Sequence, residues 1–245
     1  MHSRFKFRSN EKELLDEVNI DSGLLNENLR ELDILNRISG GHSLSLFGIK
    51  QLIKDHDKLY HIVDLGCGSG DALKYIADWA RINKYGLRLT GVDMNPGAIE
   101  YLEKHCSDYP EIKGVVADYQ DYLNKTPGID IVHASLFCHH LNDAQLSDLF
   151  LYFRQKLNVG FIINDLYRHW IAYYSAWLFT RLFNGTELSK NDGPVSVLRS
   201  FKSSELIMLL DKAGIINYSI HRKRLFRLII VGNLENYEAV TRFQS

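Results

Sequence analysis

Two different hydrophobic periodicities divide the chain. In the first 58 residues, apolar side chains within 14–18 and 25–38 recur every three or four positions. This spacing places them on one face of a helix. Gly40 and Gly41 follow the second run, and glycine is common just past a helix end. We therefore expect residues 1–58 to form a helical cap or lid.

From residue 59 onward, short apolar runs alternate with amphipathic helical patterns. The runs predict five strands, at residues 60–65, 87–92, 112–117, 129–135 and 159–165. The helical patterns lie between them, at residues 71–83, 96–105 and 143–157. Strands that alternate with helices predict βαβ units and a parallel sheet covered on both faces.

The alternation ends after the fifth strand. The next segments read as a long aromatic helix, a polar loop and a further helix, at residues 166–183, 184–194 and 203–213. Two strands at 216–221 and 225–232 then flank a short basic turn, which predicts an antiparallel hairpin. We therefore expect one core domain over residues 59–245, with an aromatic helical insertion at about 166–200.

Composition narrows the class of protein. Of 245 residues, 45% are hydrophobic and 24% charged, as in an ordinary globular domain. The 29 basic and 30 acidic side chains lack the positive excess of a nucleic-acid binder, so we expect no nucleic-acid partner. The most apolar stretch, residues 170–180, is uncharged for 11 residues, whereas a membrane-spanning helix needs about 20. It predicts a buried helix or a lipophilic pocket wall rather than an integral membrane segment.

The number of cysteines indicates whether the protein works in a reducing or an oxidising compartment. The chain has three, Cys67, Cys106 and Cys138. An odd, low number of cysteines is not a disulfide framework and favours a reducing, cytoplasmic location.

The strongest chemical signal is a glycine-rich turn, VDLGCGSGD, between the first predicted strand and the helix after it. Gly66, Gly68 and Gly70 let the backbone approach a ligand closely, and the helix N-terminus presents free N–H groups. A dinucleotide fingerprint needs glycine at the first, third and sixth positions, but the sixth is Asp71. The Gly-Lys-Ser/Thr ending of a phosphate-binding P-loop is also missing.

Three further candidate ligand-binding segments lie at the ends of the next predicted strands. Asp93 ends the second strand, where an acidic residue accepts hydrogen bonds from ribose hydroxyls. Asp118, followed by Tyr119, ends the third, and residues 135–137 (SLF) end the fourth. All lie at strand carboxyl ends, the edge at which open α/β sheets bind ligands.

At this point the chain resembles the class I S-adenosylmethionine-dependent methyltransferases, in particular small-molecule members of the quinone and polyketide type. The matching segments are VDLGCGSG, TGVDMNP, VVADYQD and DIVHASLFCHHL, within about residues 59–232. The resemblance implies an α/β, Rossmann-like fold whose seven-stranded, mostly parallel sheet ends in an antiparallel hairpin, and S-adenosylmethionine as cofactor. It also implies the following cofactor-binding residues: Asp64, Gly66, Cys67, Gly68, Gly70, Asp93, Met94, Asp118, Tyr119, Ser135, Leu136 and Phe137.

Four residues are candidates for catalysis. Methyl transfer is an in-line displacement, and a base is needed only where the acceptor must lose a proton. His139 and His140 follow the fourth strand, so one of them is expected near the transferred methyl group. Asp165 and His169 lie four residues apart after the fifth strand, one helical turn if that segment is helical. We expect no metal site.

Substrate contacts are expected from two regions. Arg168 is a candidate to neutralise an acidic acceptor, with a solvent-facing role as the equal alternative. Trp170 and Tyr173 suggest an aromatic wall for a flat or lipophilic acceptor, although core packing is the simpler role for such residues. Arg37 and His42 are the candidates from the helical cap.

We therefore predict methyl transfer from S-adenosylmethionine to a small acceptor, with an aromatic or polyketide-derived hydroxyl favoured. C-methylation of a quinone-type ring is the alternative and asks for the same pocket. The alternatives of other classes are a non-catalytic nucleotide-binding module, an NAD-dependent oxidoreductase and a methyltransferase acting on RNA or protein. A homodimer is left open.

Overall fold

A single mixed sheet organises the molecule. The computed structural model describes residues 3–16 and 20–235. Its seven strands lie in the order β3-β2-β1-β4-β5-β7-β6. They are β1 (Leu59–Leu65), β2 (Gly86–Asp93), β3 (Ile112–Val116), β4 (Ile131–Ser135), β5 (Gly160–Leu166), β6 (Tyr218–Lys223) and β7 (Arg227–Asn233). The first five pair in parallel, and β7 runs antiparallel to both β5 and β6. The predicted sheet with its C-terminal hairpin is confirmed.

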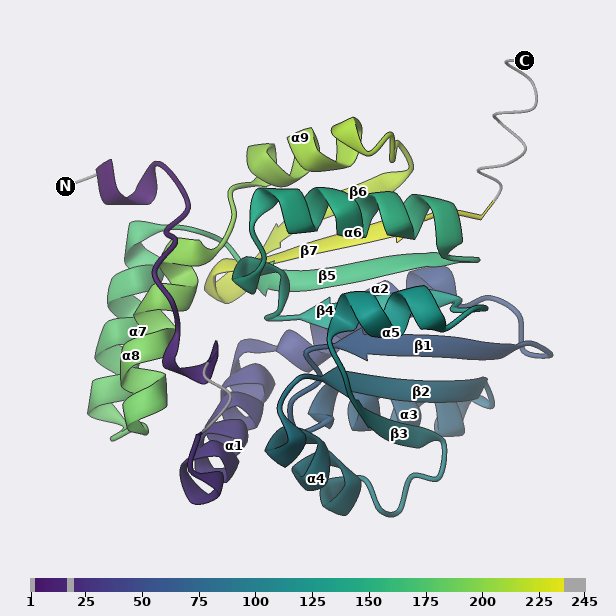
Figure 1. The fold of residues 1–245 in the computed structure, drawn as a ribbon, viewed down its shortest axis with the longest axis horizontal. Helices are drawn as coiled ribbons and strands as arrows, with labels where there is room; N and C mark the ends of the chain where they lie inside the picture. The colour runs from purple at the N-terminus through teal and green to yellow at the C-terminus, as the bar shows by residue number, and fades with distance from the viewer. Residues whose placement is uncertain (1–2, 17–19, 236–245) are drawn as a thin grey trace.

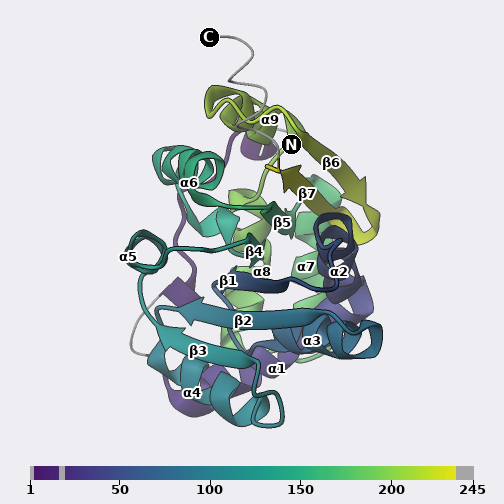
Figure 2. The ribbon, with the colours of Figure 1, turned by 90° about the vertical axis from the view of Figure 1, so that its right-hand side faces the viewer.

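Helices cover both faces of this sheet, as Figure 2 shows. One face carries α2 (Gly41–Leu52), α3 (Asp71–Asn83) and α4 (Pro96–His105). The other carries α5 (Tyr119–Lys125), α6 (Asp143–Lys156) and α9 (Ser203–Lys212). Successive strand residues point to opposite faces, so Ile62 joins one apolar cluster and Val63 the other. This alternation explains why the central strands read as continuous apolar runs.

The N-terminal part approaches the carboxyl edge of the sheet. Helix α1 (Ser22–Ser39) ends at Gly40, which adopts a left-handed conformation, and α2 begins directly after it. The residues before α1, 3–16, form an extended arm with two short 3-10 turns, η1 (Ser3–Phe5) and η2 (Leu14–Asp16). The arm is the purple segment beside the α7–α8 pair in Figure 1. The predicted helical run at 14–18 is therefore a 3-10 turn as far as residue 16, and its remainder lies outside the described residues.

The polar loop expected at residues 184–194 is wrong. Helix α8 (Glu187–Arg199) begins there, and the Thr186 hydroxyl caps it by accepting from the N–H of Ser189. Several of the polar side chains that suggested a loop have partners within the protein. The Asp192 carboxylate accepts the N–H groups of Leu14 and Leu15 in the arm, at 2.8 and 2.9 Å. This pairing offsets the cost of burying that carboxylate.

The aromatic segment also differs from its prediction. Strand β5 continues to Leu166, so the helix, α7 (Trp170–Leu182), starts later than expected. Only Ala172 of α7 is buried, and Trp170 and Trp177 are 45% and 43% exposed. A buried helix or pocket wall is therefore wrong for most of this segment, because α7 packs mainly on α8, at the edge of the molecule. The short elements that were not predicted include α5 and the 3-10 turn η4 (Arg224–Phe226).

None of the helices in the described ranges, 3–16 and 20–235, combines the length and apolarity needed to cross a membrane.

Candidate active site

The glycine turn after β1 is a tight cradle. Gly66, Gly68 and Gly70 all have positive φ, of 64°, 49° and 78°. A Cβ on Gly66 would lie 2.5 Å from Cδ2 of Phe137, which is too close for any side chain. Two N–H groups of the turn, of Gly66 and Cys67, donate to the carbonyl oxygen of Val92 and so tie the turn to β2. Glycine is therefore required here by both conformation and space.

The acidic residue at the end of β2 completes this cradle. Asp93 Oδ2 accepts the N–H of Gly68 at 3.1 Å, and Oδ1 accepts the N–H of Asn95 at 2.9 Å. Burial raises the pKa of the Asp93 carboxyl, and these two donors oppose the rise. Each oxygen keeps a second lone pair, so the carboxylate is placed to accept from hydroxyl groups of a ligand.

A cavity of about 420 Å³ opens along this edge. Its lining includes eleven of the twelve predicted cofactor residues: Asp64, Gly66, Cys67, Gly68, Asp93, Met94, Asp118, Tyr119, Ser135, Leu136 and Phe137. Gly70 does not line it, because it stands at the start of α3 against Leu102 and Cys106. Leu136 has a positive φ of 53°, a strained value that marks the turn after β4.

Asp118 and Tyr119 also have structural roles. The Asp118 carboxylate caps α5 by accepting the N–H groups of Gln120 and Asp121. Tyr119 is buried and packs edge-on against Phe137, with ring centroids 5.4 Å apart. Its hydroxyl is buried without a hydrogen-bond partner among the described residues, so the cavity wall holds a polar group that a ligand can satisfy.

Asp64 belongs to a buried polar network beneath the turn. Its Oδ1 lies 2.6 Å from Nδ1 of His133, whose Nε2 lies 2.7 Å from Oγ of Ser45 in α2. Asn164 donates from Nδ2 to the same Oγ at 3.0 Å. Asp64 does not cap α3, whose cap, Gly70, makes no side-chain bond. The network fixes α2 and three strands under the cradle.

The charges of the cavity favour a cationic ligand. Among the described residues that line it, neither lysine nor arginine occurs. The lining does include six aspartates, Asp16, Asp33, Asp64, Asp71, Asp93 and Asp118. S-adenosylmethionine carries a sulfonium, an ammonium and a carboxylate group, and this field attracts its net positive charge, whereas the pyrophosphate of NAD would be repelled. The acids, the glycine cradle and the unpaired hydroxyl therefore fit S-adenosylmethionine.

His139 is held as a charged, buried group. Its Nδ1 lies 2.8 Å from Oδ1 of Asp165, and its Nε2 lies 3.5 Å from Oε1 of Glu13. Burial alone would lower the pKa of His139, but the two carboxylates outweigh burial and raise it to about 10. An imidazole that keeps its proton is a poor base. The predicted pairing of Asp165 with His169 is wrong, because β5 is still extended at Asp165 and turns its side chain to His139.

His140 is more accessible and faces the arm. Its Nδ1 lies 2.6 Å from Oδ1 of Asp16. Burial would raise the pKa of the Asp16 carboxyl, but hydrogen bonds from His140 and Arg199 lower it below its usual range. His140 and Asp16 line both the cofactor cavity and a second cavity of about 880 Å³, which also contacts Arg8. Asp16 and Glu13 were missed from the sequence, because they lie in an arm far from His139 and His140 along the chain.

The predicted substrate residues are scattered. Arg168 is buried, donates to the carbonyls of Phe5, Lys6 and Ser200 and pairs with Glu205, so it anchors the arm. The other predicted substrate residues, and the catalytic candidate His169, have the following surroundings. Trp170 is half-exposed, the Tyr173 hydroxyl accepts from Arg4, Arg37 pairs with Asp33, His42 lies on Asp33 and lines the cofactor cavity, and His169 caps α7 and stacks on Phe226.

Comparisons with known proteins show which domain and which fold the chain resembles. Residues 62–160 match a family model described as a methyltransferase domain. No curated protein matches the sequence. Among solved structures, the plantazolicin methyltransferase BpumL in complex with SAH has a TM-score of 0.62 and 17% identity, over 85% of this chain and 88% of that one.

Two further structures have the same fold. Human N-acetylserotonin methyltransferase in complex with SAM has a TM-score of 0.57 and 17% identity, over 88% of this chain and 57% of that one. The CMeT domain of the citrinin polyketide synthase has a TM-score of 0.54 and 10% identity, over 76% of this chain and 49% of that one. Residues 62–160 are therefore similar to a methyltransferase domain, and the chain has the Rossmann-like fold of solved S-adenosylmethionine-dependent methyltransferases.

Proposed function

We propose that the enzyme methylates a hydroxyl group of a small aromatic or polyketide-derived acceptor. The observation that carries this proposal is the position of His140, which lines both the cofactor cavity and the larger cavity beside it. The two cavities also share Asp16, Leu141 and Gln145. An acceptor in the larger cavity would therefore meet the cofactor at His140.

The cofactor, when bound, supplies an electrophilic methyl group and its own leaving group. This chain has to align the acceptor and receive its proton. Asp16 holds Nδ1 of His140 at 2.6 Å, which fixes the ring and leaves Nε2 toward Glu13 and the larger cavity. A base of this kind typically contributes about 10²–10⁴-fold. His139 then acts as a positioning residue, because it stays protonated between Asp165 and Glu13.

C-methylation of a quinone-type ring is the second candidate. It is favoured by one comparison, because the citrinin synthase domain is named as a CMeT domain. The same cavities and the same base serve an acidic ring carbon. The two reactions differ in the product, since O-methylation removes a hydroxyl proton and C-methylation removes a ring proton. Nuclear magnetic resonance of the methylated product separates them.

The cofactor part of the proposal is tested by calorimetric titration with S-adenosylhomocysteine, with NADH as the control ligand. We expect saturable binding of the first, and loss of that binding in Asp93→Ala, which removes two backbone contacts of the cradle. Tight binding of NADH, or no binding of S-adenosylhomocysteine, would refute it.

The acceptor part is tested with a panel of phenols and quinones, with S-adenosylhomocysteine release as the readout. His140→Gln should lower kcat about 10²–10⁴-fold while leaving cofactor affinity unchanged. The matched control is His221→Gln, a histidine exposed on β6. Equal turnover in His140→Gln and the wild type would remove His140 as the base.

Location and assembly complete the proposal. Cys67, Cys106 and Cys138 are free and buried, which suits the reducing cytoplasm. The arm and α1 would act as the lid over the cofactor, since Leu15, Leu25 and other residues from them line its cavity. Sedimentation of the purified enzyme tests the homodimer.

A further inference from the structure

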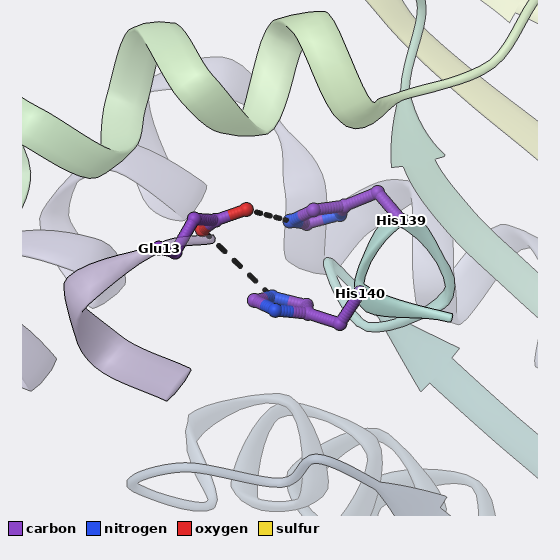
Figure 3. A group of neighbouring side chains, drawn as sticks. All are labelled: Glu13, His139 and His140. Atoms are coloured by element: carbon purple, nitrogen blue, oxygen red, sulfur yellow. Dashed lines mark ion pairs between the residues drawn. The ribbon is translucent and has the colours of Figure 1, made fainter. Parts of the chain in front are cut away.

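A second cluster of chemically active side chains lies where the arm meets the turn η3 (Cys138–His140). Glu13, His139 and His140 each offer one ligand atom, and these atoms all lie within 4.8 Å of one another. Figure 3 shows the Glu13 carboxylate facing both rings. We propose that these three residues bind one divalent transition-metal ion.

The outer contacts of both rings already suit metal binding. Asp165 holds Nδ1 of His139 and Asp16 holds Nδ1 of His140, at 2.8 and 2.6 Å. Both Nε2 atoms are therefore directed toward Glu13, at 3.5 and 3.9 Å from its carboxylate oxygens. A carboxylate on the far nitrogen of a histidine is the usual arrangement around metal-bound imidazoles, where it orients the ring and raises its basicity.

Glu13 adds an independent observation. Its side chain is only 3% exposed, yet Oε1 has no hydrogen-bond partner among the described residues. The other oxygen, Oε2, accepts from the Ser196 hydroxyl at 2.7 Å, which fixes the direction of the carboxylate. The two cationic groups nearest to Oε1, His139 and Arg199, both lie 3.5 Å away, so this buried oxygen has a coordination position that a metal ion can fill at a shorter distance.

The surrounding charges leave room for a divalent cation. Glu13, Asp16 and Asp165 are the carboxylates that contact the two histidines, and Arg199 is the guanidinium that contacts Asp16 and Glu13. These groups leave two negative charges once a metal ion replaces the Nε2 proton of the His139 imidazolium. Arg199 approaches Asp16 at 2.6 Å and Glu13 at 3.5 Å, so its main partner is Asp16. Arg8, nearby, pairs instead with Asp143 and backbone carbonyls.

The donor set selects the kind of metal. Two imidazoles and one carboxylate suit zinc and related first-row ions, and magnesium prefers an all-oxygen shell. Three protein ligands leave the fourth tetrahedral position open, as in catalytic zinc sites. All three residues line the larger cavity, so the open position faces the space in which the acceptor is proposed to bind.

Metal binding and proton uptake by His140 exclude each other, because both use Nε2. A metal at this site would instead take up the acceptor oxygen directly and lower its pKa. This consequence rests on the proposed function, whereas the ion site itself does not. The two are therefore tested by separate readouts on the same samples.

The experiment is a titration of untagged, chelator-treated enzyme with Co²⁺, followed by visible absorption, and then displacement by Zn²⁺. We expect one Co²⁺ per chain with the absorption bands of a tetrahedral site. Glu13→Gln and His140→Gln should each weaken binding at least about tenfold, since loss even of an outer-shell partner typically costs about 10–100-fold. His221→Gln is the matched control and should bind as the wild type does. Excess Mg²⁺ should leave the bands in place.

Binding of S-adenosylhomocysteine to the same samples shows that each variant is folded. If Glu13→Gln does not fold, His140→Gln decides the result, because its side chain is 22% exposed and tolerates substitution better. Co²⁺ binding that is unchanged in His140→Gln, or absent from the wild type, overturns the metal site while leaving the methyltransferase proposal intact. If the wild type does not bind S-adenosylhomocysteine, the result counts against the methyltransferase proposal alone.

Discussion

The glycine cradle offers a quantitative test, because two glycines of this chain separate conformation from space. Gly66 has φ of 64°, and an added Cβ would lie 2.5 Å from the Phe137 ring. Gly128 has φ of 72°, and an added Cβ would meet nothing within 4 Å. Gly128→Ala therefore reports the left-handed backbone alone, at about 1–2 kcal/mol. Gly66→Ala adds overpacking of about 1–3 kcal/mol, so its total is about 2–5 kcal/mol.

Urea unfolding of the two variants gives the difference in free energy of unfolding, and calorimetry gives the affinity for S-adenosylhomocysteine. We expect Gly128→Ala to keep wild-type affinity. Gly66→Ala should lose at least about tenfold in affinity, equivalent to about 1.4 kcal/mol, because the Phe137 ring must move within the cofactor cavity. Equal destabilisation in the two variants, or wild-type affinity in Gly66→Ala, would refute the steric reasoning.

Three further predictions concern the scaffold. Arg168→Met should destabilise the fold by about 3 kcal/mol in urea unfolding, because Arg168 pairs with Glu205 and donates to backbone carbonyls of the arm. The KM for the acceptor should stay unchanged. A raised KM with normal stability would instead support a role of Arg168 in substrate binding. Asn142→Ala removes the capping box of α6 and should cost about 1 kcal/mol, measured as a fall of about 2–4 °C in Tm; an unchanged Tm contradicts this. Burial raises the pKa of Cys106 from 9.0 to about 11, so the stability contributed by its thiol form is complete below pH 9 and is lost toward pH 11. Cys106→Ala should therefore flatten the fall in the free energy of unfolding between pH 9 and pH 11. The same pH dependence in the variant and the wild type would contradict this.

The sheet and the cofactor side of the site followed from local sequence signals. Strand and helix periodicities depend on neighbouring residues, so β1 to β5 and the helices α3, α4 and α6 were predictable. Gly66, Asp93 and Asp118 lie where strands end, and the parallel topology brings strand ends to one edge. Short elements such as α5 were missed, since seven residues carry little periodic signal.

Residues 166–200 depended on contacts that a local pattern does not contain. The polar stretch before Pro194 is helical because Asp192 has partners in the arm, and α7 leaves most of its aromatic side chains at the surface. The aromatic content alone did not distinguish a pocket wall from an exposed helix. Propensity is a weak guide wherever such tertiary partners decide the outcome.

The sequence by itself determined the class of fold, the position of the cofactor edge and the presence of two histidines beside it. Only the tertiary structure decided the roles of those histidines. Asp165 and Glu13 enclose His139, and Asp16 orients His140 between two cavities. The physical reason is that the pKa and direction of an imidazole depend on charges within a few ångströms, and here these charges come from segments far apart in the chain.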